Sequence, residues 1–228
     1  MTGRRVALVS GANRGIGAAI VQALTAAGWD VSAGVRRPRP MDGAAHVHPY
    51  DAQDRSSEKA WVAAAVERFG RIDAIVANAG IMIPKTVIEA DDEDLDALLE
   101  VNVKSPLRLI RAAWPQLVAC GRGRVVTIVS LSGLRVKAPR AGLYSVSKFA
   151  AQALTHAVRQ TGWDDGIRAI SVCPGFVASD MSAALTDKAP EAMTQAEDLA
   201  RIVAFVLDLP NTASIATLPI NSALEESW

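Results

Sequence analysis

The sequence predicts an α/β fold: a doubly wound parallel sheet of about seven strands with helices on both faces. Short apolar runs, often β-branched, alternate with longer helical patterns along almost the whole chain, as in βαβ units. A glycine-rich turn follows the first apolar run. The 228 residues are half hydrophobic, which suits one large domain over 1–228.

Six short apolar runs are the predicted strands. They show little polar alternation, which is typical of strands buried on both faces. They cover residues 6–9, 31–35, 46–50, 72–77, 125–129 and 167–172, the third being the least apolar. Parallel strands need crossovers, usually helical. Helices are accordingly predicted at 16–27, 57–69, 94–119, 147–161 and 196–207, with Gly70 and Gly162 as left-handed residues after two of them.

Charge and composition exclude several partner classes. Lys plus Arg and Asp plus Glu both number 24, so net charge gives no reason to expect nucleic acid or an anionic membrane as partner. No apolar run approaches the roughly 20 residues of a membrane span, and no signal peptide is visible. We therefore expect a soluble, cytoplasmic protein.

No metal site is predicted. His46 and His48 have no carboxylate or cysteine nearby in the sequence pattern, and Cys120 and Cys173 do not form a ligand spacing. Both cysteines are expected to be buried, reduced thiols. The acidic run 91–94 opens the longest predicted helix, where negative charge is favoured by the helix dipole.

The glycine-rich turn predicts a dinucleotide phosphate site. Its spacing is G-x-x-x-G-x-G, directly between a strand and a helix. Glycine permits a tight turn and close approach of backbone N–H groups to a pyrophosphate at the helix N-terminus. The residues expected to contact the cofactor here are Gly11, Asn13, Arg14, Gly15, Ile16 and Gly17.

Two arginines predict NADP(H) rather than NAD(H). The second strand ends in Gly34-Val35-Arg36-Arg37, without the acid that usually binds a ribose 2′-hydroxyl. Arg14 and Arg36 would instead bind a 2′-phosphate through charge-assisted hydrogen bonds. The alternative is that both are ordinary surface arginines.

Tyr144 and Lys148 predict proton transfer. They lie at i and i+4, on one face of a helix. An ammonium about 4 Å from the phenolate would contribute up to about 4 kcal/mol at an effective dielectric of 20, or about three pKa units. Together with the glycine loop, this predicts hydride transfer coupled to proton transfer, as in an oxidoreductase. The alternative is an exposed helical pair.

With these segments, the chain resembles the short-chain dehydrogenase/reductase family over nearly its whole length, which implies a Rossmann-like fold. The resemblance implies that Ser130, Tyr144 and Lys148 are catalytic and that Asn102 belongs to a proton relay. It also implies cofactor contacts at Asp51, Asn78, Ala79, Gly80, Tyr144, Lys148, Pro174, Gly175, Val177 and Ser179.

The sequence departs from the family pattern in places. Ser10 and Ser179 stand where threonine is usual, and Ala77 replaces an asparagine. The interval from Ser130 to Tyr144 is one residue longer than is typical for the family. Ser132 is therefore a rival for the role of catalytic serine. The C-terminal segment resembles a short-tailed branch that includes NADP-dependent 3-hydroxy acid dehydrogenases.

Three functions remain open from the sequence. The first is an NADP(H)-dependent carbonyl reductase or alcohol dehydrogenase. The second is a 3-hydroxy acid (serine-type) dehydrogenase or 3-oxoacyl thioester reductase, for which Arg135, Lys137 and Arg140 would steer a carboxylate. The alternative is that these three are solvated loop charges. The third is a catalytically silent dinucleotide sensor, which would be expected to lack one of the catalytic residues.

The substrate pocket and the assembly are expectations of the same resemblance. Four apolar residues are expected to line a partly hydrophobic pocket: Leu131, Leu143, Phe176 and Met181. A short lid is expected at 182–195. The family's four-helix interface implies a homotetramer or homodimer.

Overall fold

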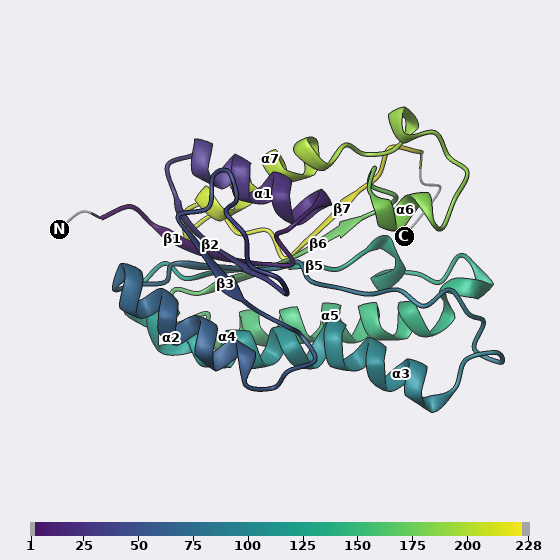
Figure 1. The fold of residues 1–228 in the computed structure, drawn as a ribbon, viewed down its shortest axis with the longest axis horizontal. Helices are drawn as coiled ribbons and strands as arrows, with labels where there is room; N and C mark the ends of the chain where they lie inside the picture. The colour runs from purple at the N-terminus through teal and green to yellow at the C-terminus, as the bar shows by residue number, and fades with distance from the viewer. Residues whose placement is uncertain (1–2, 225–228) are drawn as a thin grey trace.

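The computed structural model describes residues 3–224 and contains one seven-stranded, all-parallel sheet (Figure 1). The strands lie in the order β3-β2-β1-β4-β5-β6-β7. Their bounds are β1 Val6–Ser10, β2 Asp30–Val35, β3 His46–Pro49, β4 Ala74–Ala77, β5 Arg124–Ile128, β6 Arg168–Pro174 and β7 Thr217–Ile220. The predicted doubly wound sheet is confirmed. Its order reverses between β1 and β4, the kind of position where open α/β sheets bind ligands.

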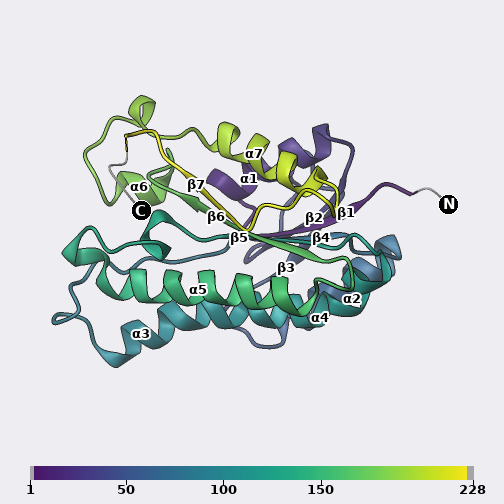
Figure 2. The same cartoon turned by 180° about the vertical axis from the view of Figure 1, so that it is seen from behind.

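Helices cover both faces of the sheet. α1 (Gly15–Ala26) and α7 (Ala196–Asp208) lie on one face, and α2 (Ser57–Phe69), α4 (Ser105–Ala119) and α5 (Gly142–Thr161) on the other (Figure 2). Each layer buries its own apolar cluster. The first includes Ile20, Leu24 and Val203, and the second includes Trp61, Leu109 and Leu117.

The longest predicted helix is interrupted. Instead of one helix over 94–119, the chain forms α3 (Asp92–Leu99), a π-helical segment (Glu100–Lys104) and α4. Pro106 has no N–H, so it cannot donate to the carbonyl of Asn102 as a residue of a continuous α-helix would. Single-turn π segments often occur at functional sites. The sequence did not locate this break, because Pro106 and Pro115 both stand inside the predicted helix and α4 continues through Pro115.

Other boundaries explain residues singled out in the sequence. Asp91 and Asp94 form a reciprocal capping box at the start of α3, which accounts for two of the acids in that run. Gly70 has a φ of +74°, as predicted, but Gly162 has a φ of −98°, so its predicted left-handed conformation is wrong. Gly162 allows close packing instead, because an added Cβ would lie 2.7 Å from the Cβ of Ile167.

The sequence analysis predicted no strand at β7 and placed the start of α5 too late. β7 contains Pro219 and lies at the edge of the sheet, where a missing N–H is tolerated. α5 begins at Gly142 rather than at 147, so Tyr144 and Lys148 both lie within it.

Among residues 3–224, no helix is long and apolar enough to cross a membrane. Both cysteines are free thiols; Cys173 is buried as predicted, whereas Cys120 is partly exposed.

Candidate active site

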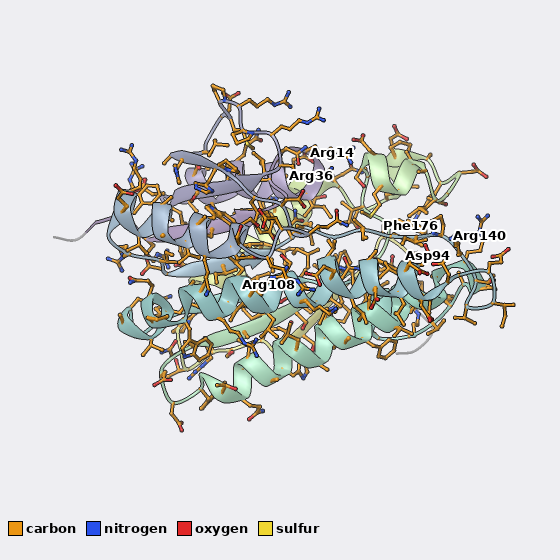
Figure 3. The ribbon with its side chains drawn as sticks, turned by 60° about the horizontal axis from the view of Figure 1, so that its bottom comes forward. Arg14, Arg36, Asp94, Arg108, Arg140 and Phe176 are labelled. Atoms are coloured by element: carbon orange, nitrogen blue, oxygen red, sulfur yellow. The ribbon has the colours of Figure 1, made fainter. Side chains whose placement is uncertain are left out.

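A cavity of about 1700 Å³ runs along the carboxyl edge of the sheet. It brings together every residue predicted to contact a cofactor, although these come from six separate parts of the chain. The lining includes Gly11, Asn13, Arg14, Gly15, Ile16, Gly17, Arg36, Asp51, Asn78, Ala79, Gly80, Tyr144, Lys148, Pro174, Gly175, Val177 and Ser179. Figure 3 shows Arg14 and Arg36 at the glycine-loop end and Phe176 and Arg140 toward the other end.

The glycine loop has the geometry of an anion cradle. Gly11 and Gly15 have φ values of +65° and +53°, which favour glycine. A Cβ on Gly17 would lie 2.3 Å from the carbonyl oxygen of Gly11, so only glycine lets helix and loop approach this closely. α1 carries no side-chain cap and no acid in its first turn. Its N-terminal N–H groups therefore suit a phosphate.

Hydrogen bonds brace this loop against the segment after β4. The hydroxyl of Ser10 accepts from the backbone N–H groups of Asn78 and Ala79, both at 3.0 Å. The side chain of Asn78 donates to the carbonyl oxygens of Ser10 at 3.0 Å and Gly11 at 3.2 Å. Serine in place of the family's usual threonine keeps the hydroxyl that makes these bonds.

Positive charge gathers at the glycine-loop end of the cavity. Arg36, Arg37 and Arg39 line it, and β2 ends without an acid. Arg14 also lines it but forms an ion pair with Asp180. Asp180 begins α6 (Asp180–Ala183), which is capped by Ser179. The sequence gives no sign of this pairing, because Arg14 and Asp180 lie 166 positions apart.

Ser130, Tyr144 and Lys148 meet at the centre of the cavity. The hydroxyl of Ser130 lies near enough to the Tyr144 phenol to lower the phenol's pKa. Ser130 also accepts from the backbone N–H of Ser132 at 3.1 Å. Lys148 Nζ lies 5.6 Å from the ring centroid of Tyr144 and donates to the carbonyl of Ile128 at 3.0 Å. Of the two serines, Ser130 is the one whose hydroxyl influences the phenol, and the backbone N–H of its rival Ser132 orients that hydroxyl.

Burial shifts the pKa values of Tyr144 and Lys148 in the protein without cofactor. Burial raises the pKa of the Tyr144 phenol to about 12, although the hydrogen bond from Ser130 opposes the change. Burial lowers the pKa of the Lys148 ammonium to about 8. In the protein without cofactor, desolvation thus dominates at both groups. The lowering of the phenol pKa by Lys148 together with an oxidised cofactor stays a prediction.

Asn102 lies behind the cavity rather than in its lining. Its side chain is buried and donates to the carbonyl of Ile81 and the hydroxyl of Ser147, both at 3.0 Å. Its Oδ1 accepts from the backbone N–H of Ile81 at 3.0 Å. The side-chain amide is thus fully engaged, and Asn102 braces the segment beside Gly80, where an added Cβ would lie 3.2 Å from Oδ1.

The opposite end of the cavity is apolar with a cationic rim. Leu131, Phe176 and Met181 line it as predicted, whereas Leu143 does not. The rim cations are Arg135, Lys137, Arg140 and Lys188. Lys188 was not among the predicted cations of the substrate end, because it lies within the expected lid. Its ammonium donates to the hydroxyl of Ser222 at 2.9 Å.

The segment 182–195 is attached to the cavity wall at one end. Thr194 pairs with Val177 in a parallel bridge, and the N–H of Ala178 donates to the carbonyl of Thr194 at 2.9 Å. Between Ala183 and Met193 the chain forms a 3₁₀ turn at Pro190–Ala192 and is mostly exposed.

Comparison with known proteins agrees with this geometry. A family model described as short chain dehydrogenase matches residues 5–190. An agropine synthesis reductase of Rhizobium rhizogenes is 40% identical over 218 residues, which cover 92% of this chain and 50% of that protein. The chain thus spans about half the length of this relative. A glycine betaine reductase of Emericella nidulans is 34% identical over 193 residues, covering 80% of this chain and 15% of that protein.

Solved structures show the same architecture. An alcohol dehydrogenase from the archaeon Thermococcus sibiricus, complexed with 5-hydroxy-NADP, superposes with a TM-score of 0.87 at 26% identity over 99% of both chains. A protein named gox2181 superposes with a TM-score of 0.83 at 23% identity over 95% of both chains.

Proposed function

Because the chain belongs to the short-chain dehydrogenase family of oxidoreductases, we propose that it interconverts a carbonyl and a secondary alcohol with NADP(H). The observation that carries this proposal is that Ser130, Tyr144 and Lys148 line the same cavity as the glycine loop. A proton donor, an oxyanion donor and a phosphate cradle then face one space.

Tyr144 is proposed as the general acid and base. In the reduction direction its phenol donates a proton to the carbonyl oxygen of the substrate, while the carbonyl carbon accepts a hydride. A bound nicotinamide dinucleotide supplies that hydride. Ser130 donates to the same oxygen and stabilises the developing negative charge. Both hydroxyls are already neighbours in the structure, so one carbonyl oxygen can contact both.

Lys148 and Asn102 are proposed to support the proton transfer. The pKa of about 8 keeps the Lys148 ammonium charged at pH 7, which favours the phenolate that remains after proton donation. Lys148 would also hold the nicotinamide ribose. The side-chain amide of Asn102 is already hydrogen-bonded within the protein. The backbone carbonyl oxygen of Asn102 is therefore the group proposed to hold a water that connects Lys148 to solvent.

The preference for NADP(H) is supported by charge. Arg14 and Arg36 line the glycine-loop end of the cavity, where the end of β2 carries no acid. Guanidinium groups bind phosphate through paired, charge-assisted hydrogen bonds. The Thermococcus sibiricus alcohol dehydrogenase carries an NADP derivative, which supports the same choice.

An anionic substrate is the second candidate. Arg140 and Lys188 place positive charge at the rim of the substrate end of the cavity, beside the apolar Phe176 and Met181. A 3-hydroxy acid or 3-oxoacyl thioester would pair an anionic group with these cations and an apolar stem with the wall. A neutral ketone would use the apolar wall alone.

A screen of NADPH oxidation tests these functions. The purified protein is incubated with NADPH and matched pairs of neutral ketones, ketoacids and acyl thioesters, and the alcohol product is identified by mass spectrometry. Stoichiometric alcohol formation supports the oxidoreductase. A preference for each ketoacid over its methyl ester favours the second candidate. Tight NADPH binding without turnover on any carbonyl would favour a dinucleotide sensor.

A homo-oligomer and a closing lid complete the proposal. Val146 and Phe149 on α5 are 49% and 42% exposed, which supports pairing of this helix layer between copies. The exposed segment 182–195 would close over the substrate. Sedimentation as a monomer at micromolar concentration would contradict the proposed dimer or tetramer.

A further inference from the structure

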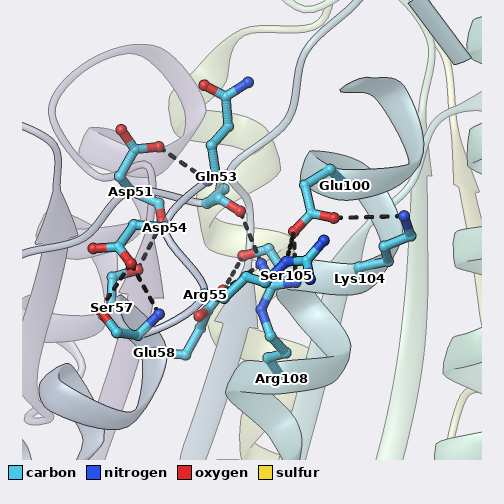
Figure 4. A network of polar contacts seen from close by, with 12 residues as sticks. Asp51, Gln53, Asp54, Arg55, Ser57, Glu58, Glu100, Lys104, Ser105 and Arg108 are labelled. Carbon is cyan, nitrogen blue, oxygen red and sulfur yellow. Dashed lines mark hydrogen bonds and ion pairs between the residues drawn. The ribbon is translucent and has the colours of Figure 1, made fainter. Parts of the chain in front are cut away.

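A network of charged groups lies beneath the cavity, between α2 and α4 (Figure 4). At its centre, Arg108 on α4 contacts Glu58 Oε1 on α2 at 3.1 Å and donates to Glu100 Oε1 in the π segment at 2.6 Å. Glu58 is buried, with 1% of its side chain exposed. Burying a carboxylate is costly unless it is paired. The burial of Glu58 beside Arg108 therefore raises the question of what this ion pair does for the protein.

The network also reaches the segment that follows β3. Residues 50–53, which we call the adenine corner, line the cavity where the family resemblance expects Asp51 to contact adenine. Arg108 Nη2 donates to the carbonyl oxygen of Ala52 at 2.9 Å. Tyr50 hydrogen-bonds Ser105 at 2.6 Å, and Ser105 donates to Glu58 at 2.6 Å. The corner is thus attached to α2 and α4 by polar bonds on either side of Asp51, buried at Tyr50 and partly buried at Ala52.

Resting on the proposed function, we propose that Arg108 is a positioning residue for the adenine end of the cofactor. Its guanidinium holds Ala52 against Glu58 and Glu100, and thereby fixes the backbone that presents Asp51 to the cavity. Arg108 itself does not line the cavity. It acts through the adenine corner.

Arginine suits this position for a geometric reason. A guanidinium presents donors in a rigid plane, so one group serves the Ala52 carbonyl, Glu58 and Glu100 together. The ammonium of lysine keeps the charge but is a single point on a flexible stem. Arg108→Lys therefore preserves charge balance while loosening the adenine corner.

The experiment uses two parts of the cofactor. 2′,5′-ADP and 5′-AMP carry the adenine end, whereas reduced nicotinamide mononucleotide carries the other end. Calorimetry of Arg108→Lys with the two adenine nucleotides should show a Kd about 5- to 50-fold higher than in the wild type. The kcat/KM with reduced nicotinamide mononucleotide should change less than about twofold, because that probe does not reach the corner. Arg111→Lys, an exposed change on the same helix, is the matched control and should alter neither value.

Three outcomes overturn the inference. They are an unchanged Kd for both adenine nucleotides, an equal loss with reduced nicotinamide mononucleotide, and the same effect in Arg111→Lys. If Arg108→Lys does not fold, the double variant Glu58→Gln, Arg108→Met leaves no carboxylate at 58 to go unpaired and is judged by the same measurements. Wild-type protein that binds neither adenine nucleotide nor NADPH would instead contradict the proposed function.

Discussion

Arg14 in the glycine loop and Asp180 in the first turn of α6 form an ion pair, although they lie 166 positions apart. The pair joins the cofactor end of the cavity to the start of the segment proposed as a lid. The backbones are also close there, because an added Cβ on Gly15 would lie 3.6 Å from the Cβ of Ser179. In the protein alone, Asp180 occupies the guanidinium that the NADP(H) proposal assigns to a phosphate.

Removing the charge of Asp180 should therefore favour NADPH. In Asp180→Asn, Arg14 no longer has to leave an ion partner, so the KM for NADPH should fall about two- to fivefold, as for the loss of an exposed pair. The KM for NADH should not change. Steady-state kinetics with both cofactors measures this, with Asp187→Asn, an exposed lid residue, as control. Equal shifts for the two cofactors would contradict the competition.

Arg36 should set cofactor preference from the other side. The wild type is expected to have a higher kcat/KM with NADPH than with NADH. Arg36→Gln removes one charge-assisted contact, so kcat/KM with NADPH should fall about 10- to 100-fold while that with NADH is retained. A wild type that uses NADH as well as NADPH would show that the assignment of Arg14 and Arg36 is wrong.

Loss of the Tyr144 hydroxyl should abolish turnover without loss of binding. Tyr144→Phe keeps the ring but removes the proton donor, so kcat should fall to less than about a tenth of the wild-type value. NADPH affinity and the circular dichroism spectrum should be retained. If the variant keeps more than a tenth of the wild-type kcat, Tyr144 is not the proton donor.

The two serines near Tyr144 should respond differently. Ser130→Ala removes the hydroxyl beside the phenol and is expected to lower kcat about 100- to 1000-fold, as for loss of an oxyanion donor. Ser132→Ala keeps the backbone N–H that orients Ser130 at 3.1 Å and should retain most of the activity. A larger loss in Ser132→Ala would reverse the assignment.

Lys148 should destabilise the fold in a pH-dependent manner. Its pKa falls from 10.5 in the unfolded chain to about 8 in the folded protein, because of burial. Below pH 8 the folded state carries the full cost of the buried charge, on the order of 3 kcal/mol. That cost disappears as the pH rises from about 8 to 10.5, since the folded state then gives up its proton before the unfolded chain does.

Lys148→Met tests this sign. At pH 7 its Tm should exceed that of the wild type by about 3–8 °C, after part of the gain is offset by the lost bond to Ile128. The difference should shrink toward pH 10.5, and activity should be lost throughout. Differential scanning calorimetry across this range is the measurement, and a variant less stable than the wild type at pH 7 would contradict it.

The sequence predicted most of the fold because the relevant signals are local. Apolar runs placed six of the seven strands, and the helix at 57–69 was predicted with the bounds that the structure shows. β7 was missed because its run is short and contains Pro219. The π segment was missed because a continuous helix and an interrupted one share nearly the same apolar pattern. Proline alone does not mark the break, since α4 continues through Pro115.

What the sequence by itself determined is the set of groups at the site: glycines where φ must be positive, a serine hydroxyl, and a phenol and an ammonium four residues apart. Only the tertiary structure decided how those groups are paired and solvated. Asp180 on Arg14, Ala52 on Arg108 and the dry surroundings of Tyr144 all come from elements far apart in the chain. Hydrogen-bond partners and desolvation depend on what packs around a group in space, and residue spacing carries no information about that.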